Sequence, residues 1–171
     1  MQEHGLKISE LVTLFNLEVL NRGSDYDTAL LTITDVNRPG LQFHSFYDYF
    51  DPRRLQVLGK AEITYLKGLT TEQRRKCFDD LFLYDIPALV ISRGLDCFPE
   101  CLESARVHER TLLRTEETTV EFTSHTIEYL NRVLAPCVTR HGVLLDISGE
   151  GVMITGDSGI GKSESAIELI M

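Results

Sequence analysis

An eight-residue stretch near the end of this 171-residue chain constrains its fold more than any other feature. It fits the phosphate-binding pattern G-x-x-x-x-G-K-[ST] and consists of Gly156, Asp157, Ser158, Gly159, Ile160, Gly161, Lys162 and Ser163. The outer glycines allow backbone approaches that a Cβ would block, so successive N–H groups can wrap around a phosphate. Lys162 can reach β- and γ-phosphate oxygens, and the Ser163 hydroxyl can bind Mg²⁺. These residues predict a nucleotide-binding loop.

The residues on either side supply the context that such a loop requires. An apolar run over residues 152–155 predicts a strand that leads into the loop, and residues 163–170 favour a helix that leads out of it. A bound phosphate would then lie at the positive end of that helix. The alternative interpretation is a glycine-rich turn that binds no ligand.

Composition narrows the class of protein. The chain is 43% hydrophobic and 25% charged, which is typical of a globular protein. Its formal net charge of −9 argues against nucleic acid as a partner. No apolar run approaches the length of a membrane span, and residues 1–5 lack the pattern of a signal peptide. We therefore expect a cytoplasmic protein with no membrane partner and with four reduced cysteines.

Residues 1–134 are predicted to form one α/β domain without a catalytic constellation. Apolar spacing predicts helices over residues 8–16, 100–107 and 119–134, a further helix that begins at Thr70, and strands over residues 17–20, 30–34, 61–66, 86–91 and 112–113. Thr70 and Gln73 have the spacing of a capping box at the start of the second helix. An aromatic cluster is expected to seal a small core: Phe43, Phe46, Tyr47, Tyr49 and Phe50.

The last helix of this domain is expected to end before Pro136. Its predicted apolar face consists of Thr123, Ile127, Leu130 and Leu134.

Two apolar runs within residues 141–155 predict a β-hairpin directly before the phosphate loop. They flank a turn-prone segment, residues 148–151, and the hairpin is expected to be centred on Gly149 and Glu150. This register places His141 opposite Ser158, where an imidazole can donate to a phosphoryl oxygen or respond to its charge. The alternative is a histidine at the start of a strand that only bonds the backbone, and both interpretations stay open.

Residues 140–147 and 151–164 closely resemble the bacterial HPr kinase/phosphorylase family. Residues 35–41, together with Arg53, Gln56, Gly59 and Glu62, look like the N-terminal domain of the same family. The resemblance spans essentially the whole chain, and residues 141–164 are its most specific part.

The resemblance implies an enzyme linked to carbon catabolite control. Members of this family phosphorylate a seryl residue of the phosphocarrier protein HPr with ATP or pyrophosphate, and they remove that phosphate by phosphorolysis. The implied architecture is an N-terminal α/β domain, here residues 1–134, followed by a P-loop kinase domain similar to phosphoenolpyruvate carboxykinase, here beginning at residues 135–171. The implied assembly is a hexamer, and the implied metal is Mg²⁺.

Carried over residue by residue, His141 and Lys162 match active-site residues, residues 156–163 match the nucleotide-binding loop, and Ser163 matches a Mg²⁺ ligand. The family's catalytic aspartate and a glutamate metal ligand would follow Met171. The chain is therefore expected to be a fragment or an incomplete record, inactive by itself. Two other functions stay open, namely a P-loop kinase or NTPase acting on a small molecule, and a non-catalytic module that serves assembly.

Overall fold

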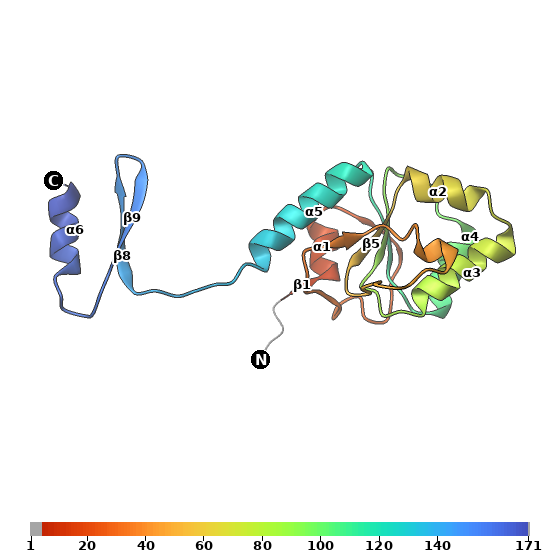
Figure 1. Cartoon of the computed structure of the whole chain (residues 1–171), viewed down its shortest axis with the longest axis horizontal. Coiled ribbons are helices and arrows are strands. Elements are labelled where there is room, and N and C mark those ends of the chain that lie inside the picture. Colours follow the sequence, from red (N-terminus) through yellow and green to blue (C-terminus); the bar gives the residue numbers. More distant parts are fainter. Residues whose placement is uncertain (1–4, 171) are drawn as a thin grey trace. The chain divides into compact units, whose positions relative to one another are not determined.

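The computed structural model describes residues 5–170 and divides the chain into two compact units, residues 1–135 and residues 136–171 (Figure 1). The first unit contains β1 (Leu6–Lys7), α1 (Ile8–Leu14), β2 (Glu18–Asn21), β3 (Leu30–Leu31), β4 (Val36–Asn37), the 3₁₀ helix η1 (Gln42–His44), β5 (Leu55–Leu58), α2 (Lys60–Lys67), α3 (Thr71–Phe82), β6 (Leu89–Ile91), α4 (Pro99–Val107), β7 (Leu112–Arg114) and α5 (Thr119–Val133). The second unit contains β8 (Gly142–Ile147), β9 (Glu150–Thr155) and α6 (Lys162–Ile170).

A five-stranded sheet in the order β2-β7-β6-β5-β4 forms the centre of the first unit. Strands β4 to β7 run parallel to one another, and β2 joins β7 in the antiparallel direction. The central strands β5 and β6 are buried along their whole length, as expected for parallel strands that are covered on both faces. A separate two-stranded ladder pairs β1 with β3. The sequence therefore predicted the α/β class correctly.

Helices cover both faces of this sheet, and each face has its own apolar core (Figure 1). The core on the side of α2, α3 and α4 contains Phe78, Leu89 and Leu112. The core on the side of α1 and α5 contains Val90 and Leu113. Neighbouring strand residues thus serve opposite cores, because successive side chains of a strand point to opposite faces.

Helix α3 begins as the sequence predicts. The Thr70 hydroxyl accepts from the Gln73 N–H at 3.2 Å, and the Gln73 side chain accepts from the Thr70 N–H at 3.0 Å. The reciprocal pair satisfies two of the N–H groups that a helix start leaves without partners. The apolar face of α3, which ends at Phe82, is buried in the core.

The strand predicted over residues 61–66 is wrong, because this segment forms helix α2. Glu62 lies at the third helical position, and its carboxylate accepts from the Gly59 N–H at 2.9 Å. Ile63 and Leu66, three residues apart, are both buried in the core, which is helical spacing. The alternation of polar and apolar residues therefore suggested a strand, whereas a helix cap and the packing of one face favour the helix.

Two further expectations need correction. Of the aromatic cluster, Phe43 is buried and Phe50 packs partly buried against the same core, whereas Phe46 and Tyr49 are exposed and do not seal it. The buried residues of α5 are Thr119, Phe122, Thr126 and Leu130. Of the predicted face, Leu130 is therefore confirmed and Leu134 packs partly buried against the same core, whereas Phe122 and Thr126 are buried in place of Thr123 and Ile127.

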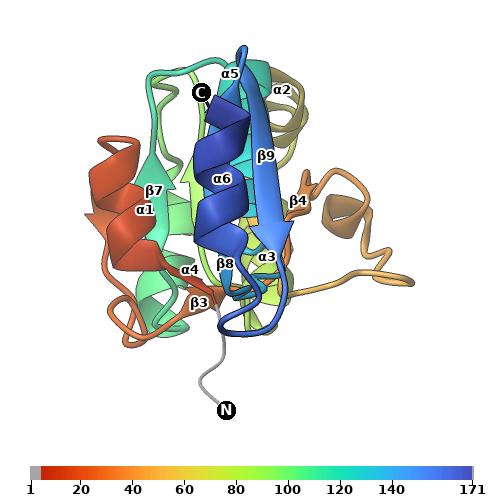
Figure 2. The same cartoon turned by 90° about the vertical axis from the view of Figure 1, so that its left-hand side faces the viewer.

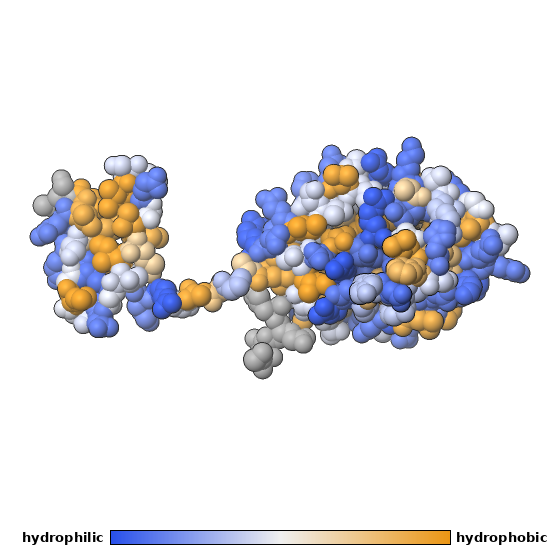
Figure 3. All heavy atoms as spheres, viewed as in Figure 1, coloured by the Kyte–Doolittle hydropathy of each residue, from blue (hydrophilic) through white to orange (hydrophobic). Residues whose placement is uncertain are grey.

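The second unit consists of the β8–β9 hairpin and α6, which contacts β8 (Figure 2). Its described residues bury only Leu145 and Ala166. Several large apolar side chains are exposed in this unit, and hydrophobic residues cover much of its visible surface in Figure 3: Leu144, Val152, Met153, Ile160, Ile167, Leu169 and Ile170.

Candidate phosphate-binding site

The predicted hairpin is present, but its register differs from the prediction. Ile147 pairs with Glu150, and Gly142 pairs with Thr155. The turn therefore consists of Ser148 and Gly149, one residue earlier than predicted. Extended by one pair, this register places His141 opposite Gly156 rather than Ser158. The partner changes by two residues, so His141 stays on the same face of the ladder.

The backbone at the turn explains this register. Ser148 has φ 56° and Gly149 has φ 88°. Positive φ at both central residues matches the twist of the flanking strands in a two-residue hairpin. The Asp146 carboxylate accepts from the Gly149 N–H at 2.8 Å and stabilises the turn. The predicted register placed the turn at the centre of the four turn-prone residues 148–151. It did not include the hydrogen bond from the Gly149 N–H to the Asp146 side chain.

The loop over residues 156–161 connects β9 to α6, which begins at Lys162. Gly159 has φ 83° and Gly161 has φ 90°, values at which a side chain is strained. The Gly161 carbonyl accepts from the Ser165 N–H at 3.0 Å, which is the first bond of the helix. The strand, loop and helix predicted around this motif are therefore all present.

Lys162 folds back over the loop. Its ammonium group donates to the Gly156 carbonyl at 2.9 Å and also to the Asp157 carbonyl. These two carbonyls hold a cation over the residues that are predicted to bind phosphate. A phosphate group at the loop would compete with the two carbonyls for this ammonium group, because a charged acceptor forms the stronger hydrogen bond.

The loop offers few ligands for a metal. The Ser163 side chain is exposed in the first turn of α6, and a Cβ placed on Gly161 would lie 3.8 Å from the Glu164 carboxylate. The described residues contain no group of three or more His, Cys, Asp or Glu side chains that could hold a metal ion. A hydroxyl and a carboxylate are oxygen donors of the kind that Mg²⁺ prefers. Residue spacing alone did not indicate that Glu164 lies beside the loop.

A second polar cluster contains Glu62, Ser92 and Thr119, and the side chains of these residues form hydrogen bonds within the fold. It lies where β5 and β6 end, the edge at which open parallel sheets bind ligands. The Glu62 carboxylate accepts from Arg38 at 2.8 Å, and Ser92 and Thr119 share a hydrogen bond of 2.7 Å. Burial favours the protonated acid, but donors from Arg38 and from the backbone outweigh it and hold the pKa of Glu62 below its ordinary value. These groups have partners within the fold, so the phosphate loop is the stronger candidate.

Comparisons with known families agree with the division of the chain. The model described as "HPr Serine kinase N terminus" matches residues 6–130. The model described as "HPr Serine kinase C-terminal domain" matches residues 132–171. The phosphate loop falls within the second match.

Curated relatives from several bacteria are similar along almost the whole chain. A protein of Alkaliphilus metalliredigens named HPr kinase/phosphorylase is 46% identical over 165 residues, which cover 96% of this chain and 53% of that relative. A protein of Clostridium beijerinckii with the same name is 45% identical over 166 residues, which cover 97% of this chain and 54% of that relative. The chain thus spans about half the length of the curated relatives it matches.

One solved structure shares the fold with 15% sequence identity and a TM-score of 0.52. It contains the CBS and DRTGG domains of the regulatory region of a Clostridium perfringens pyrophosphatase, and the match covers 74% of this chain and 49% of that one.

Among the described residues, none of the helices has both the length and the apolar character needed to cross a membrane.

Proposed function

Because the chain belongs to the HPr serine kinase family, we propose that it is part of an HPr kinase/phosphorylase. In this proposal the protein phosphorylates a seryl residue of HPr with ATP or pyrophosphate and removes that phosphate by phosphorolysis, in support of carbon catabolite control. The observation that carries the proposal is the strand–loop–helix arrangement at residues 150–170, with two left-handed glycines and Lys162 over the loop.

The proposed roles of the loop residues follow from their chemistry. Backbone N–H groups of residues 156–163 bind the β-phosphate, assisted by the positive end of α6. Lys162 exchanges its two carbonyl partners for β- and γ-phosphate oxygens. His141 stabilises the transferring phosphoryl group from the neighbouring strand. Mg²⁺ neutralises phosphate charge when it is bound, with the Ser163 hydroxyl as a ligand.

The same proposal covers the organisation of the protein. Residues 1–134 are a non-catalytic α/β domain. Residues 135–171 begin a P-loop kinase domain similar to phosphoenolpyruvate carboxykinase. The partners are HPr and a nucleotide, the assembly is a homo-hexamer, and the location is the cytoplasm. The name of the curated relatives supports HPr as the partner, and the other statements are what the resemblance to the family implies.

Nucleotide binding to the chain tests the loop directly. Calorimetric titration with ATP and with pyrophosphate, each with Mg²⁺, is compared between the unchanged chain and Lys162→Met. We expect a loss of affinity on the order of tenfold or more, because a charged hydrogen-bond donor to phosphate is removed. Lys67→Met is the matched control, since Lys67 is an exposed lysine of the first unit. We expect this variant to bind ATP and pyrophosphate with unchanged affinity.

Equal affinities of Lys162→Met and the unchanged chain contradict the proposed loop. The transfer reaction needs a second assay, in which a full-length protein containing these residues acts on HPr. Lys162→Met abolishes phosphorylation of HPr in that assay if the assignment is right. If the full-length protein modifies a small molecule and leaves HPr unchanged, the alternative kinase function is correct.

A further inference from the structure

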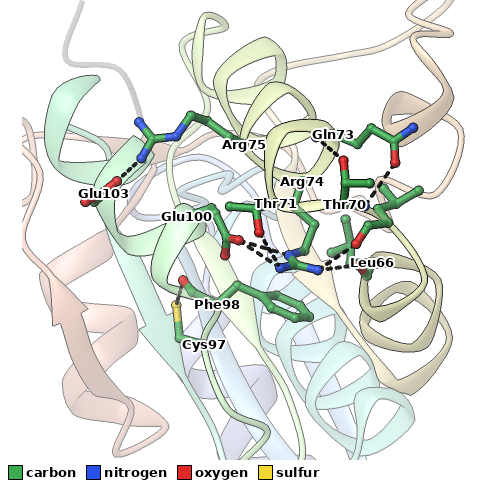
Figure 4. A network of polar contacts seen from close by, with 11 residues as sticks. Leu66, Thr70, Thr71, Gln73, Arg74, Arg75, Cys97, Phe98, Glu100 and Glu103 are labelled. Atoms are coloured by element: carbon green, nitrogen blue, oxygen red, sulfur yellow. Dashed lines mark hydrogen bonds and ion pairs between the residues drawn. The ribbon is translucent and has the colours of Figure 1, made fainter.

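Two cysteines lie together at the start of α4, in the unit that carries no proposed catalytic residue. Cys97 precedes the N-cap residue Phe98, and Cys101 lies in the first turn of the helix. Cys101 is fully buried, whereas Cys97 is partly exposed and packs against the same apolar core. Figure 4 shows Cys97 beside Phe98, next to the ion pair of Arg74 and Glu100. Cys97 is therefore partly accessible to solvent, whereas Cys101 is enclosed.

The surroundings give the two thiols opposite acidities. The neighbouring Cys101 thiol lowers the pKa of Cys97, and Arg114 on β7 acts in the same direction, against burial and Glu100. The Cys97 thiol also contacts the Phe98 carbonyl, to which it donates at 3.4 Å. Burial and the neighbouring Cys97 thiol raise the pKa of Cys101. An acidic, accessible thiol next to a second, protonated thiol is the arrangement of oxidation-sensitive cysteine pairs.

We propose that Cys97 and Cys101 form a redox-active dithiol, at which a hydroperoxide converts the reduced chain into one with an intramolecular disulfide. The inference does not depend on the proposed kinase function. It rests on the placement of two thiols at one helix start, with one of them open to solvent. In a reducing compartment such a bond is transient and serves redox sensing.

The reaction has two steps, and each is balanced. The Cys97 thiolate attacks one oxygen of the hydroperoxide, the O–O bond breaks, and the alkoxide leaves and takes a proton from solvent to become an alcohol. Cys97 is then a sulfenic acid. The Cys101 sulfur attacks the Cys97 sulfur, an S–S bond replaces the S–O bond, and hydroxide leaves with the Cys101 proton as water. In sum, the dithiol is oxidised and the hydroperoxide is reduced to alcohol and water.

The other two cysteines serve as internal references. Cys77 is buried, its thiol donates to the Phe43 carbonyl at 3.4 Å, and burial raises its pKa. Cys137 is exposed. A reaction governed only by exposure therefore modifies Cys137 first, whereas a reaction governed by the dithiol links Cys97 to Cys101.

Peptide mapping after mild oxidation tests the proposal. The folded chain with Cys137→Ser, which prevents disulfides between chains through that residue, is treated with a slight excess of hydrogen peroxide. The expected product has lost two hydrogen atoms, contains a Cys97–Cys101 link and returns to the starting mass with dithiothreitol. In a Cys101→Ala variant, Cys97 stops at the sulfenic acid and reacts with dimedone.

Two results overturn the proposal. The first is a folded chain whose Cys97 and Cys101 stay reduced after Cys137, in the unchanged protein, has been oxidised. The second is a Cys97→Ser variant that consumes peroxide as fast as the chain that retains both thiols. This variant changes a partly exposed residue, so it keeps the test valid if Cys101→Ala does not fold. The same treatment in denaturant removes the preference for the pair if the fold creates it.

Discussion

The two units of this chain divide stability and chemistry between them. The first unit buries apolar residues on both faces of a five-stranded sheet and caps its helices with side chains. The second unit carries the phosphate loop but buries, among its described residues, only Leu145 and Ala166. Buried apolar area is the main favourable contribution to folding. The stability of this chain therefore resides mostly in the first unit, which does not contain the phosphate loop.

Substitution of a core residue gives the largest expected effect. Phe78→Ala removes a fully buried ring of the first unit that packs against Phe43, Phe82 and Phe98. The free energy of unfolding of this unit should fall by about 4 kcal/mol. Leu144→Ala in the second unit removes a side chain that is 73% exposed, and the change should stay below about 0.5 kcal/mol. Chemical denaturation of both variants measures the contrast, and equal losses would refute it.

A buried ion pair of the first unit gives the next largest effect. Arg74 and Glu100 join α3 to α4 at 2.8 Å, with side chains only 17% and 7% exposed (Figure 4). Arg74 also donates to the Leu66 and Leu69 carbonyls. Arg74→Ala leaves a buried carboxylate without its cation, so we expect a loss of about 3 kcal/mol in unfolding free energy.

The neighbouring pair of Arg75 and Glu103 joins the same two helices and is exposed. Arg75→Ala should therefore lower the free energy of unfolding by less than about 1 kcal/mol.

The effect of Arg74→Ala also depends on pH, because Arg74 holds the pKa of Glu100 below its ordinary value. A carboxyl group with a lowered pKa stabilises the fold above about pH 4 and loses this contribution as the pH falls through the folded-state pKa. The difference between Arg74→Ala and the unchanged protein should shrink in acid, and a constant difference would exclude the ionic explanation.

Gly161→Ala tests the second unit at its loop. The φ of 90° at Gly161 is strained for a residue with a side chain, so the loop in this conformation, which the proposal takes as the one that binds phosphate, should lose about 1 to 3 kcal/mol. ATP affinity falls by a corresponding factor, while the melting of the first unit is unchanged. Gly151→Ala is the control, because nothing lies within 4 Å of a Cβ placed there. If both alanines lower ATP affinity equally, the loop geometry does not govern binding.

The smallest predicted effect is at the hairpin turn. Asp146→Ala removes the acceptor for the Gly149 N–H, and the turn should lose roughly 1 kcal/mol or less because the bond is exposed to water. Amide hydrogen exchange at Gly149 should become severalfold faster, while exchange in β5 and β6 stays slow. Glu150→Ala provides the exposed control within the same hairpin. Unchanged exchange at Gly149 would show that Asp146 does not stabilise the turn.

The sequence by itself determined the features that depend on neighbouring residues. The phosphate loop, the hairpin before it, the capping box of Thr70 and Gln73 and the all-apolar strand around β6 each depend on a few adjacent side chains and their backbone. For such features the spacing of residue types carries the physical information. This is also why residues 141–164 are the most specific part of the resemblance to the family.

The tertiary structure decided features that depend on distant partners. Residues 60–67 form a helix because Glu62 is held by Arg38, which is far away in the sequence, and because Ile63 and Leu66 face one core. The hairpin register depends on positive φ at Ser148 and Gly149. The sequence alone allowed other turn positions, because Gly151 lies in the same turn-prone segment. The spacing of Cys97 and Cys101 did not indicate that one residue is buried and the other partly exposed, because this contrast arises from packing against the sheet. Local patterns specify elements, whereas burial and long-range contacts select among the alternatives that those patterns allow.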